Sequence, residues 1–292
     1  MDKEEVREHL VEYIIERERI RMARKNRIDF QTQHPALKHY RFTNIRRRDD
    51  KATKWFLNNV YNDKRMENPW LTAALCRFIN WPVTVQMLKD NDALFWNSDT
   101  FDAEKIVDLL DIWLEQGNKM ITGAYVILLG HRPAGKVRDV VYTVRDMIDN
   151  SENLWDALAC NSLEVMADAF AIQNGVGSFT SGQLVADLRL MPGVLDKATD
   201  IYTWAPIGPG SQRGLNWVYG YPIKHKWNQK DFNEALRDMA KRWVIPNLKY
   251  IKPEDISLHT IQNICCETSK LLKVLTGTGR PRAGYHSHKD LY

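Results

Sequence analysis

The chain of 292 residues is poor in cysteine and contains no long apolar run. Its four cysteines form no CxxC pair, so neither a disulfide framework nor a cysteine zinc site is expected. No stretch approaches the roughly 20 apolar residues of a membrane span, and the charged start MDKEEVREHL contains no apolar signal segment. We therefore expect a soluble cytoplasmic protein with no membrane partner, no bound metal and no cofactor.

Charge is unevenly distributed along the chain, although the formal net charge is only +4. Residues 1–54 contain 15 Lys and Arg against 10 Asp and Glu, and residues 222–292 contain 13 against 7. The central residues 55–221 contain 13 against 20. If the two basic ends meet in space, they form a basic face of the kind that binds nucleic acid.

Apolar spacing predicts helices over almost the whole chain. In residues 102–116 the apolar side chains share one face of a helix that Asp102 can cap. Further helices are predicted at 2–24, 49–60, 70–79, 137–148, 161–172, 179–189, 211–219, 231–243 and 254–273. Only YVILLG at 125–130 resembles a strand, and so short a run is ambiguous. The expected fold is all-α, one unit over the whole chain with two helical lobes near residues 1–130 and 131–292.

Two of the predicted helices meet at Gly175 and Gly177, with Ser178 next in sequence. This composition is typical of a helix-hairpin-helix turn, where backbone amides approach a DNA phosphate. For these residues alone, an ordinary turn between helices remains the simpler interpretation. Asp200 follows 23 positions after Gly177, a distance at which helix-hairpin-helix DNA glycosylases carry a catalytic aspartate.

Two aspartates and one tryptophan near this turn are candidate site residues. Asp187 lies inside an apolar helix, where an unpaired carboxylate is costly, so it is either buried with a partner or part of a site. Asp200 precedes the aromatic-rich IYTW and is the better candidate for a base. Trp204 could stack on a base that has left the duplex.

The segment Gly208-Pro209-Gly210-Ser211 begins another predicted helix, with Arg213 in the first turn. Glycines, a helix start and an arginine together make a good cradle for a phosphate or an oxyanion. The alternative is an ordinary helix start that Ser211 caps.

Basic residues also gather near both ends of the chain. The run at 16–27 includes Arg21, and the segment at 40–50 interleaves aromatics with arginines, a mixture suited to stacking and phosphate contact. A solvated charged face is the common alternative. The candidates from these regions and from the C-terminal region are Arg21, Asn44, Arg46, Arg47, Glu267, Lys270, Arg280 and Arg282.

Four blocks in this order, YRFTNIRRRDDKATKWF, NGVGSFTSGQLVADL, TDIYTWAPIGPGSQRGLN and CCETSKLLKVLTGTGRPRAGY, resemble one family. It is the DNA-glycosylase-like helical family of alpha-glutamyl/putrescinyl thymine pyrophosphorylases, or phage amino acid:DNA transferases. The same helical domain occurs in 5-hydroxymethyl-uracil DNA kinases. The likeness runs from about residue 13 to 285 and includes a CE-x-x-K element at 266–270 and a GxGRPxxxY element at 277–285. Thr268 and Ser269 stand where the family pattern leads us to expect an aromatic residue.

This resemblance implies a helix-hairpin-helix, DNA-glycosylase-like fold with two lobes around a DNA cleft, and a step of phage thymine hypermodification. The implied partners are double-stranded DNA that contains a modified uracil and a free amino acid or polyamine, with glycine slightly preferred. The amine would displace pyrophosphate from 5-pyrophosphoryloxymethyl-uracil. No kinase domain accompanies the helical domain in the sequence given, which favours the transferase over the kinase.

In that chemistry the candidate residues take three roles. Asp200 or Asp187 accepts the proton of the amine. The leaving group and substrate are held by Asn44, Arg46, Arg47, Gly208, Gly210, Ser211, Arg213, Glu267, Lys270 and Arg280. DNA is held by Gly175, Gly177, Ser178, Arg21 and Arg282, and Trp204 stacks on the base. Two alternatives stay open: a DNA glycosylase or lyase, although no lysine adjoins the hairpin, and a non-catalytic helical module that binds DNA for a modifying enzyme.

Overall fold

The computed structural model describes residues 1–121 and 135–279. Over these ranges the chain forms thirteen α-helices and four short 3-10 or π segments, and no strand. The predicted all-α fold class is therefore confirmed, and all ten predicted helices are present with ends shifted by a few residues. The candidate strand at 125–130 lies outside the described residues.

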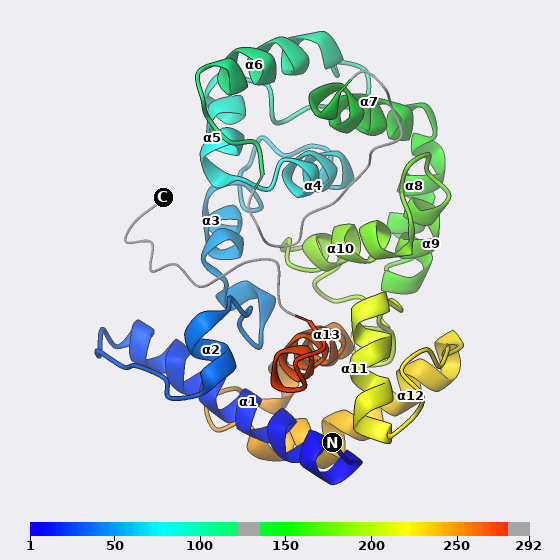
Figure 1. The fold of residues 1–292 in the computed structure, drawn as a ribbon. Helices are drawn as coiled ribbons and strands as arrows, with labels where there is room; N and C mark the ends of the chain where they lie inside the picture. Colours follow the sequence, from blue (N-terminus) through cyan, green and yellow to red (C-terminus); the bar gives the residue numbers. More distant parts are fainter. Residues whose placement is uncertain (122–134, 280–292) are drawn as a thin grey trace. The chain divides into compact units, whose positions relative to one another are not determined.

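The chain divides into two compact units (Figure 1). The first unit combines Met1–Asp50 with the chain from Ile201 onward, and the second is Lys51–Asp200. Neither boundary falls near residue 130, where the sequence suggested one. The described parts of the two basic ends lie together in the first unit, which is the condition that the sequence set for a basic face. Its described residues, 1–50 and 201–279, contain 24 Lys and Arg against 16 Asp and Glu, a net charge of +8.

The first unit is built around one central helix, α13 (Leu258–Leu275), in which twelve of 18 residues are buried. Around it pack α1, α2, α11 and α12. The other elements of the unit and their bounds are α1 (Lys3–Lys25), α2 (Pro35–His39), η1 (Arg47–Asp49), α11 (Pro209–Tyr219), α12 (Gln229–Met239), a π segment η2 (Ala240–Val244), η3 (Ile245–Asn247) and η4 (Pro253–Asp255).

Glycine allows α11 to approach α13 closely. A Cβ atom added at Gly214 would lie 1.9 Å from the carbonyl oxygen of Cys265, and one added at Gly210 would lie 2.5 Å from Sγ of Cys266. Side chains at these positions would push the helices apart. The two glycines therefore set the distance between the helices that carry most of the candidate phosphate-binding residues.

The described residues of the second unit, 51–121 and 135–200, form eight helices with α4 at their core. Nine of the ten residues of α4 are buried, and the helix packs against α7 and α10. Asn68 caps its start and Pro69 occupies the first turn, where a missing backbone N–H costs nothing. The elements are α3 (Lys51–Asn59), α4 (Pro69–Phe78), α5 (Pro82–Asp90), α6 (Ala103–Glu115), α7 (Lys136–Asp149), α8 (Ser151–Ala159), α9 (Leu163–Ala171) and α10 (Ser178–Leu188).

Candidate functional site

Basic side chains from α11 and α13 form one group in the first unit, which we call the cationic cluster: Arg213, Lys270 and Lys273. Lys270 and Lys273 share a helix face with Cys266, because they follow it by four and seven positions. The charges of both Arg213 and Lys270 act on the Cys266 thiol, which places α11 and α13 together here. Burial, and after it the charge of Arg213, lowers the pKa of Lys273. The Nε atom of Arg213 is buried without a hydrogen-bond partner among the described residues.

The start of α11 is largely capped from within the protein. Ser211 is fully buried, and its Oγ accepts a hydrogen bond from the Gly208 amide and donates one to the Gly208 carbonyl oxygen. The Oγ also accepts from Gln262 at 3.2 Å, while the Ser211 amide bonds to the Cys266 thiol. The predicted phosphate cradle thus has fewer available amides than the sequence suggested, and side-chain cations supply most of its positive charge.

Lys270 is held in place by a buried carboxylate. Its Nζ lies 2.9 and 3.0 Å from the two oxygens of Glu267 and 5.0 Å from the centre of the Phe42 ring. Glu267 also accepts a hydrogen bond from the Thr43 amide at 3.1 Å. Glu267 therefore orients Lys270 and ties the segment 40–44 to α13.

Asn44 is occupied by contacts inside the protein. Its Oδ1 accepts a hydrogen bond from Arg17 at 2.7 Å, and its Nδ2 donates to Asp50 at 2.8 Å and to the Asp49 carbonyl oxygen at 3.0 Å. Arg17 also donates to the Thr43 carbonyl oxygen, and burial lowers the pKa of its guanidinium. Asn44 thus shapes the loop.

The predicted phosphate-binding and DNA-binding arginines of the N-terminal segment are partly neutralised by acids. Arg46 pairs with Asp49 at 2.8 Å and with Asp255 at 2.9 Å. Arg21 pairs with Glu18 at 2.8 Å, and its Nε lies 3.8 Å from the same Asp49. Arg47 begins the 3-10 turn η1 and is partly exposed. Arg21 and Arg46 thus belong to one ion-pair network.

The two candidate catalytic aspartates both lie in the second unit. Asp187 is only 1% exposed and forms a buried ion pair with Arg77, whose Nε lies 2.7 Å from Oδ2. The sequence predicted that Asp187, if buried, would have a partner, and Arg77 is that partner. Its position in an apolar helix is accounted for by that pair.

Asp200 holds the start of α9. Its carboxylate accepts hydrogen bonds from the amides of Leu163 and Glu164, at 2.8 and 2.9 Å, and from Ser162 Oγ at 2.8 Å. A carboxylate at a helix start satisfies free backbone amides and interacts favourably with the helix dipole. Asp200 is half-buried, so part of it remains accessible to solvent.

The glycine turn joins α9 to α10 as a short helix–turn–helix. Gly175 has φ +77°, a left-handed conformation that favours glycine. Gly177 is the N-cap of α10 and has no side-chain cap, and both Gly177 and Ser178 are exposed. This uncapped, exposed helix start is the geometry in which backbone amides can contact a phosphate.

Trp204 lies in the core of the first unit. It is 5% exposed, and its ring meets that of His259 edge to face with the centroids 5.5 Å apart. In this conformation its ring faces are covered. The exposed aromatic side chains of the same unit include Tyr202, Tyr221 and Tyr250, which the sequence analysis did not select.

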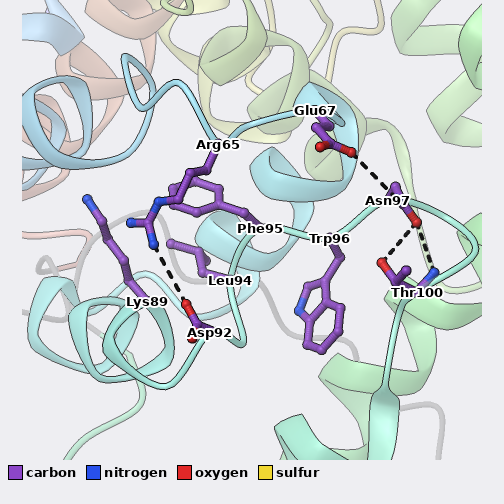
Figure 2. A pocket seen from close by; sticks show the side chains of 9 residues that line it. All are labelled: Arg65, Glu67, Lys89, Asp92, Leu94, Phe95, Trp96, Asn97 and Thr100. Carbon is purple, nitrogen blue, oxygen red and sulfur yellow. Dashed lines mark hydrogen bonds and ion pairs between the residues drawn. The ribbon is translucent and has the colours of Figure 1, made fainter.

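The second unit contains a pocket of about 280 Å³ (Figure 2). Arg65 and Lys89 lie beside Phe95, at 4.9 and 5.8 Å from the ring centre. Both cations pair with Asp63, at 3.1 and 2.9 Å, and hydrogen bonding from Arg65 lowers the pKa of that carboxyl. The pocket's cations are therefore balanced by acids and provide no excess charge for an anion.

Some predicted residues and features remain outside these sites. Arg280 and Arg282 lie outside the described residues. Over residues 1–121 and 135–279, no three His, Cys, Asp or Glu side chains are placed to hold a metal ion. None of the described helices has the length and apolar character needed to cross a bilayer. Lys273 was missed, although its spacing from Lys270 placed both on one helix face.

Comparisons with known proteins identify the family. The model of the helical domain of 5-hmdU DNA kinases matches residues 4–280. A 5-hmdU DNA kinase of Bacillus phage SP10 is 24% identical over 264 residues, which cover 82% of this chain and 40% of that protein. The chain thus spans about two-fifths of the length of this curated relative. No solved structure gives a significant match. Because the family model matches sequence in both helical units, the chain belongs to the family of 5-hmdU DNA kinase helical domains.

Proposed function

We propose that the chain is a transferase of phage thymine hypermodification. Its substrate is 5-pyrophosphoryloxymethyl-uracil in double-stranded DNA. A free amino acid or polyamine supplies the amine, and glycine is the preferred candidate. The amine nitrogen attacks the C5-methylene carbon, the carbon–oxygen bond breaks, and pyrophosphate leaves with the electron pair. Membership of a family named for kinases of 5-hydroxymethyl-uracil in DNA, the parent of the pyrophosphorylated base, supports the choice of substrate.

The cationic cluster is the observation that carries this proposal. Pyrophosphate bears several negative charges, and preorganised cations stabilise that charge as it develops. Arg213 of α11 lies close enough to Cys266 and Lys273 of α13 for its charge to act on the pKa of both groups, and burial is the larger cause of the lowered pKa of Lys273. Glu267 pairs with Lys270 but leaves the other two charges for an anion. Arg46, Arg47 and the amide of Gly210 are proposed as further contacts, whereas the Gly208 amide is already bonded to Ser211 Oγ.

The amine is protonated at neutral pH and must lose a proton before it attacks. We propose Asp200 as the base in preference to Asp187, because Asp200 is half-buried and Asp187 is enclosed with Arg77. A positioned base contributes about 10²–10⁴-fold to rate. The amides of Gly177 and Ser178 are proposed to hold the DNA backbone.

A second candidate is a non-catalytic helical module that presents DNA to a kinase. One comparison favours this candidate, because the match covers only 40% of the phage SP10 kinase. The chain therefore corresponds to one part of a larger enzyme. The same cationic cluster would then hold the phosphorylated base without reaction. The glycosylase alternative gains no support from a lysine nucleophile, because no lysine adjoins Gly175 and Gly177.

The test uses duplex DNA that carries 5-pyrophosphoryloxymethyl-uracil, incubated with the protein, amino acids and polyamines. Pyrophosphate is measured in solution, and the digested nucleosides are analysed by mass spectrometry. We expect pyrophosphate and an aminated thymidine whose mass names the amine. Arg213→Gln and Lys273→Gln should each reduce the rate at least tenfold, while the exposed Lys249→Gln should not. Binding without pyrophosphate would favour the module, and abasic sites would favour the glycosylase.

A further inference from the structure

Figure 1 shows the loop that joins α11 to α12. This loop and the first residues of α12 present lysines and apolar side chains to solvent. Its sequence from 220 to 230, GYPIKHKWNQK, contains Lys224, Lys226 and Lys230 and no acid. All three lysines are exposed, and so are Tyr221 (47%) and Ile223 (42%). We refer to residues 220–230 as the lysine loop.

The lysine loop is rigidly held, which separates it from an ordinary solvated turn. Asn216, fully buried in α11, donates to the carbonyl oxygens of Ile223 at 3.2 Å and His225 at 2.9 Å. Its Oδ1 accepts from Trp227 Nε1 at 2.6 Å, and its backbone oxygen accepts from the Tyr221 amide at 2.8 Å. One buried residue thus holds the loop at four positions, through its backbone oxygen at Tyr221 and through its side chain at Ile223, His225 and Trp227.

The aromatic rings of the loop form a preorganised platform. Tyr221 stacks on His225 with centroids 4.6 Å apart and planes at 24°. Trp227 meets both rings edge to face, at 5.4 and 5.2 Å. Exposed apolar surface that is held in one conformation loses little entropy when it is covered, so it is suited to binding.

The lysines around the aromatic platform indicate what kind of molecule it binds. Lys3 of α1 lies against Gly220, which adds a fourth lysine beside the loop. The carboxylate of Asp231, the nearest acid along the chain, accepts a hydrogen bond from Asn228 Nδ2 at the start of α12. Lysines that flank exposed aromatic and aliphatic side chains match DNA, in which phosphates border the apolar faces and edges of bases.

We propose that the lysine loop is a DNA-docking surface, with Lys224, Lys226 and Lys230 on phosphates and Tyr221 and Ile223 against bases. This inference rests on the proposed action on DNA but assigns it a contact surface separate from the cationic cluster. Its consequence is that affinity for DNA depends on two separable contributions: a salt-dependent one from the lysines and a salt-independent one from the apolar tip.

The experiment measures binding of the full chain to a fluorescent duplex that contains 5-hydroxymethyl-uracil, by anisotropy over a range of salt concentrations. In the triple variant Lys224→Gln, Lys226→Gln, Lys230→Gln we expect affinity to fall at least tenfold. The slope of log affinity against log salt should fall by between about 2 and 3, because each lost phosphate contact removes about 0.9. Tyr221→Ser with Ile223→Ser should weaken binding about fivefold and leave the slope unchanged, whereas Tyr221→Phe should bind normally.

The matched control replaces Lys241, Lys249 and Lys252 with Gln. These lysines are exposed in the same unit, and the net charge changes equally. The control should bind within about twofold of the natural sequence. Equal losses in the two triple variants would overturn the proposal, because they would show only a response to net charge. Unaltered binding by the loop variant, or no binding by the natural chain, would also overturn it.

Pyrophosphate release is measured separately, so a chain that binds DNA through the loop without releasing pyrophosphate would refute the transferase alone.

Discussion

Gly214 of α11 lies against the backbone of Cys265 in α13, so closely that a Cβ would meet the Cys265 carbonyl oxygen at 1.9 Å. Backbone cannot rotate away as a side chain can. The contact joins the two helices that carry the cationic cluster, and it leaves no space for even a methyl group.

Gly214→Ala should therefore destabilise the first unit by about 3 kcal/mol, because the added methyl group forces the packed helices apart. Urea unfolding followed by circular dichroism measures the change. Gly177→Ala is the control, since an added Cβ there meets nothing within 4 Å. A Gly214→Ala protein as stable as this control would refute the close packing.

Asp187→Asn should destabilise the second unit by about 3 to 5 kcal/mol, because it leaves the buried Arg77 charge without compensation. Asp156→Asn, the same change at an exposed site on α8, should cost little. The double variant Arg77→Met, Asp187→Leu should recover part of the loss. If Asp187→Asn kept full stability but lost turnover, Asp187 would be catalytic instead.

The variant Asp200→Asn distinguishes between two roles of Asp200, as the cap of a helix and as the catalytic base. Loss of the cap costs about 1 kcal/mol, whereas loss of a base lowers turnover by about 100-fold or more. We expect both effects, measured by urea unfolding and by pyrophosphate release. Full turnover in the double variant Asp187→Asn, Asp200→Asn would remove both residues from the mechanism.

The affinity of the cationic cluster for pyrophosphate should fall as pH rises toward about 10. The pKa of Lys273 is lowered by burial and by Arg213, so this lysine loses its charge at a lower pH than an ordinary lysine. Calorimetric titration with pyrophosphate measures the effect. Lys273→Arg, whose guanidinium stays charged, should show a smaller fall. An equal fall in both proteins would exclude Lys273 from the anion site.

One of the four thiols should react with iodoacetamide in the folded protein at about pH 8. Burial raises the pKa of Cys76 and Cys265, and it raises that of Cys266 to about 12, so these three stay protonated. Cys160 is exposed. Mass spectrometry should find one label in the native protein, none in Cys160→Ser, and four labels after denaturation. Rapid labelling of Cys266, which is partly buried, would contradict the raised pKa of its thiol.

The sequence predicted long amphipathic helices well and short ones poorly. The three helices that it missed, α2, α5 and α8, have nine residues or fewer, and apolar periodicity is weaker evidence in helices this short, although α3 and α9, also of nine residues, were predicted. In α8 the boundary was hidden as well, because Asn150 both ends α7 and precedes α8 without a glycine or proline between them.

In the candidate site, too, the features that depend on local spacing could be predicted from the sequence, and the contacts between distant residues could not. The shared face of Lys270 and Lys273 follows from helical spacing alone. The partners of Asn44 and Asp187 do not, because Arg17 and Arg77 lie 27 and 110 positions away along the chain. Which acid neutralises which arginine is decided by tertiary packing, so sequence could nominate Arg46 and Arg21 as phosphate ligands without revealing their ion pairs.

The division of the first unit between the two ends of the chain sets an order of events during synthesis. The second unit is one uninterrupted stretch and can close on the ribosome before the remainder is made. Helix α1 must wait for α11 and α13, the helices against which it packs. At about 5–20 residues per second, that delay is on the order of 10 to 50 seconds. Throughout this time the side chains of Val6, Leu10, Tyr13 and Ile14, all buried in the finished fold, lack their later partners. Until α11 and α13 are made, the apolar face of α1 is therefore open to chaperones and proteases.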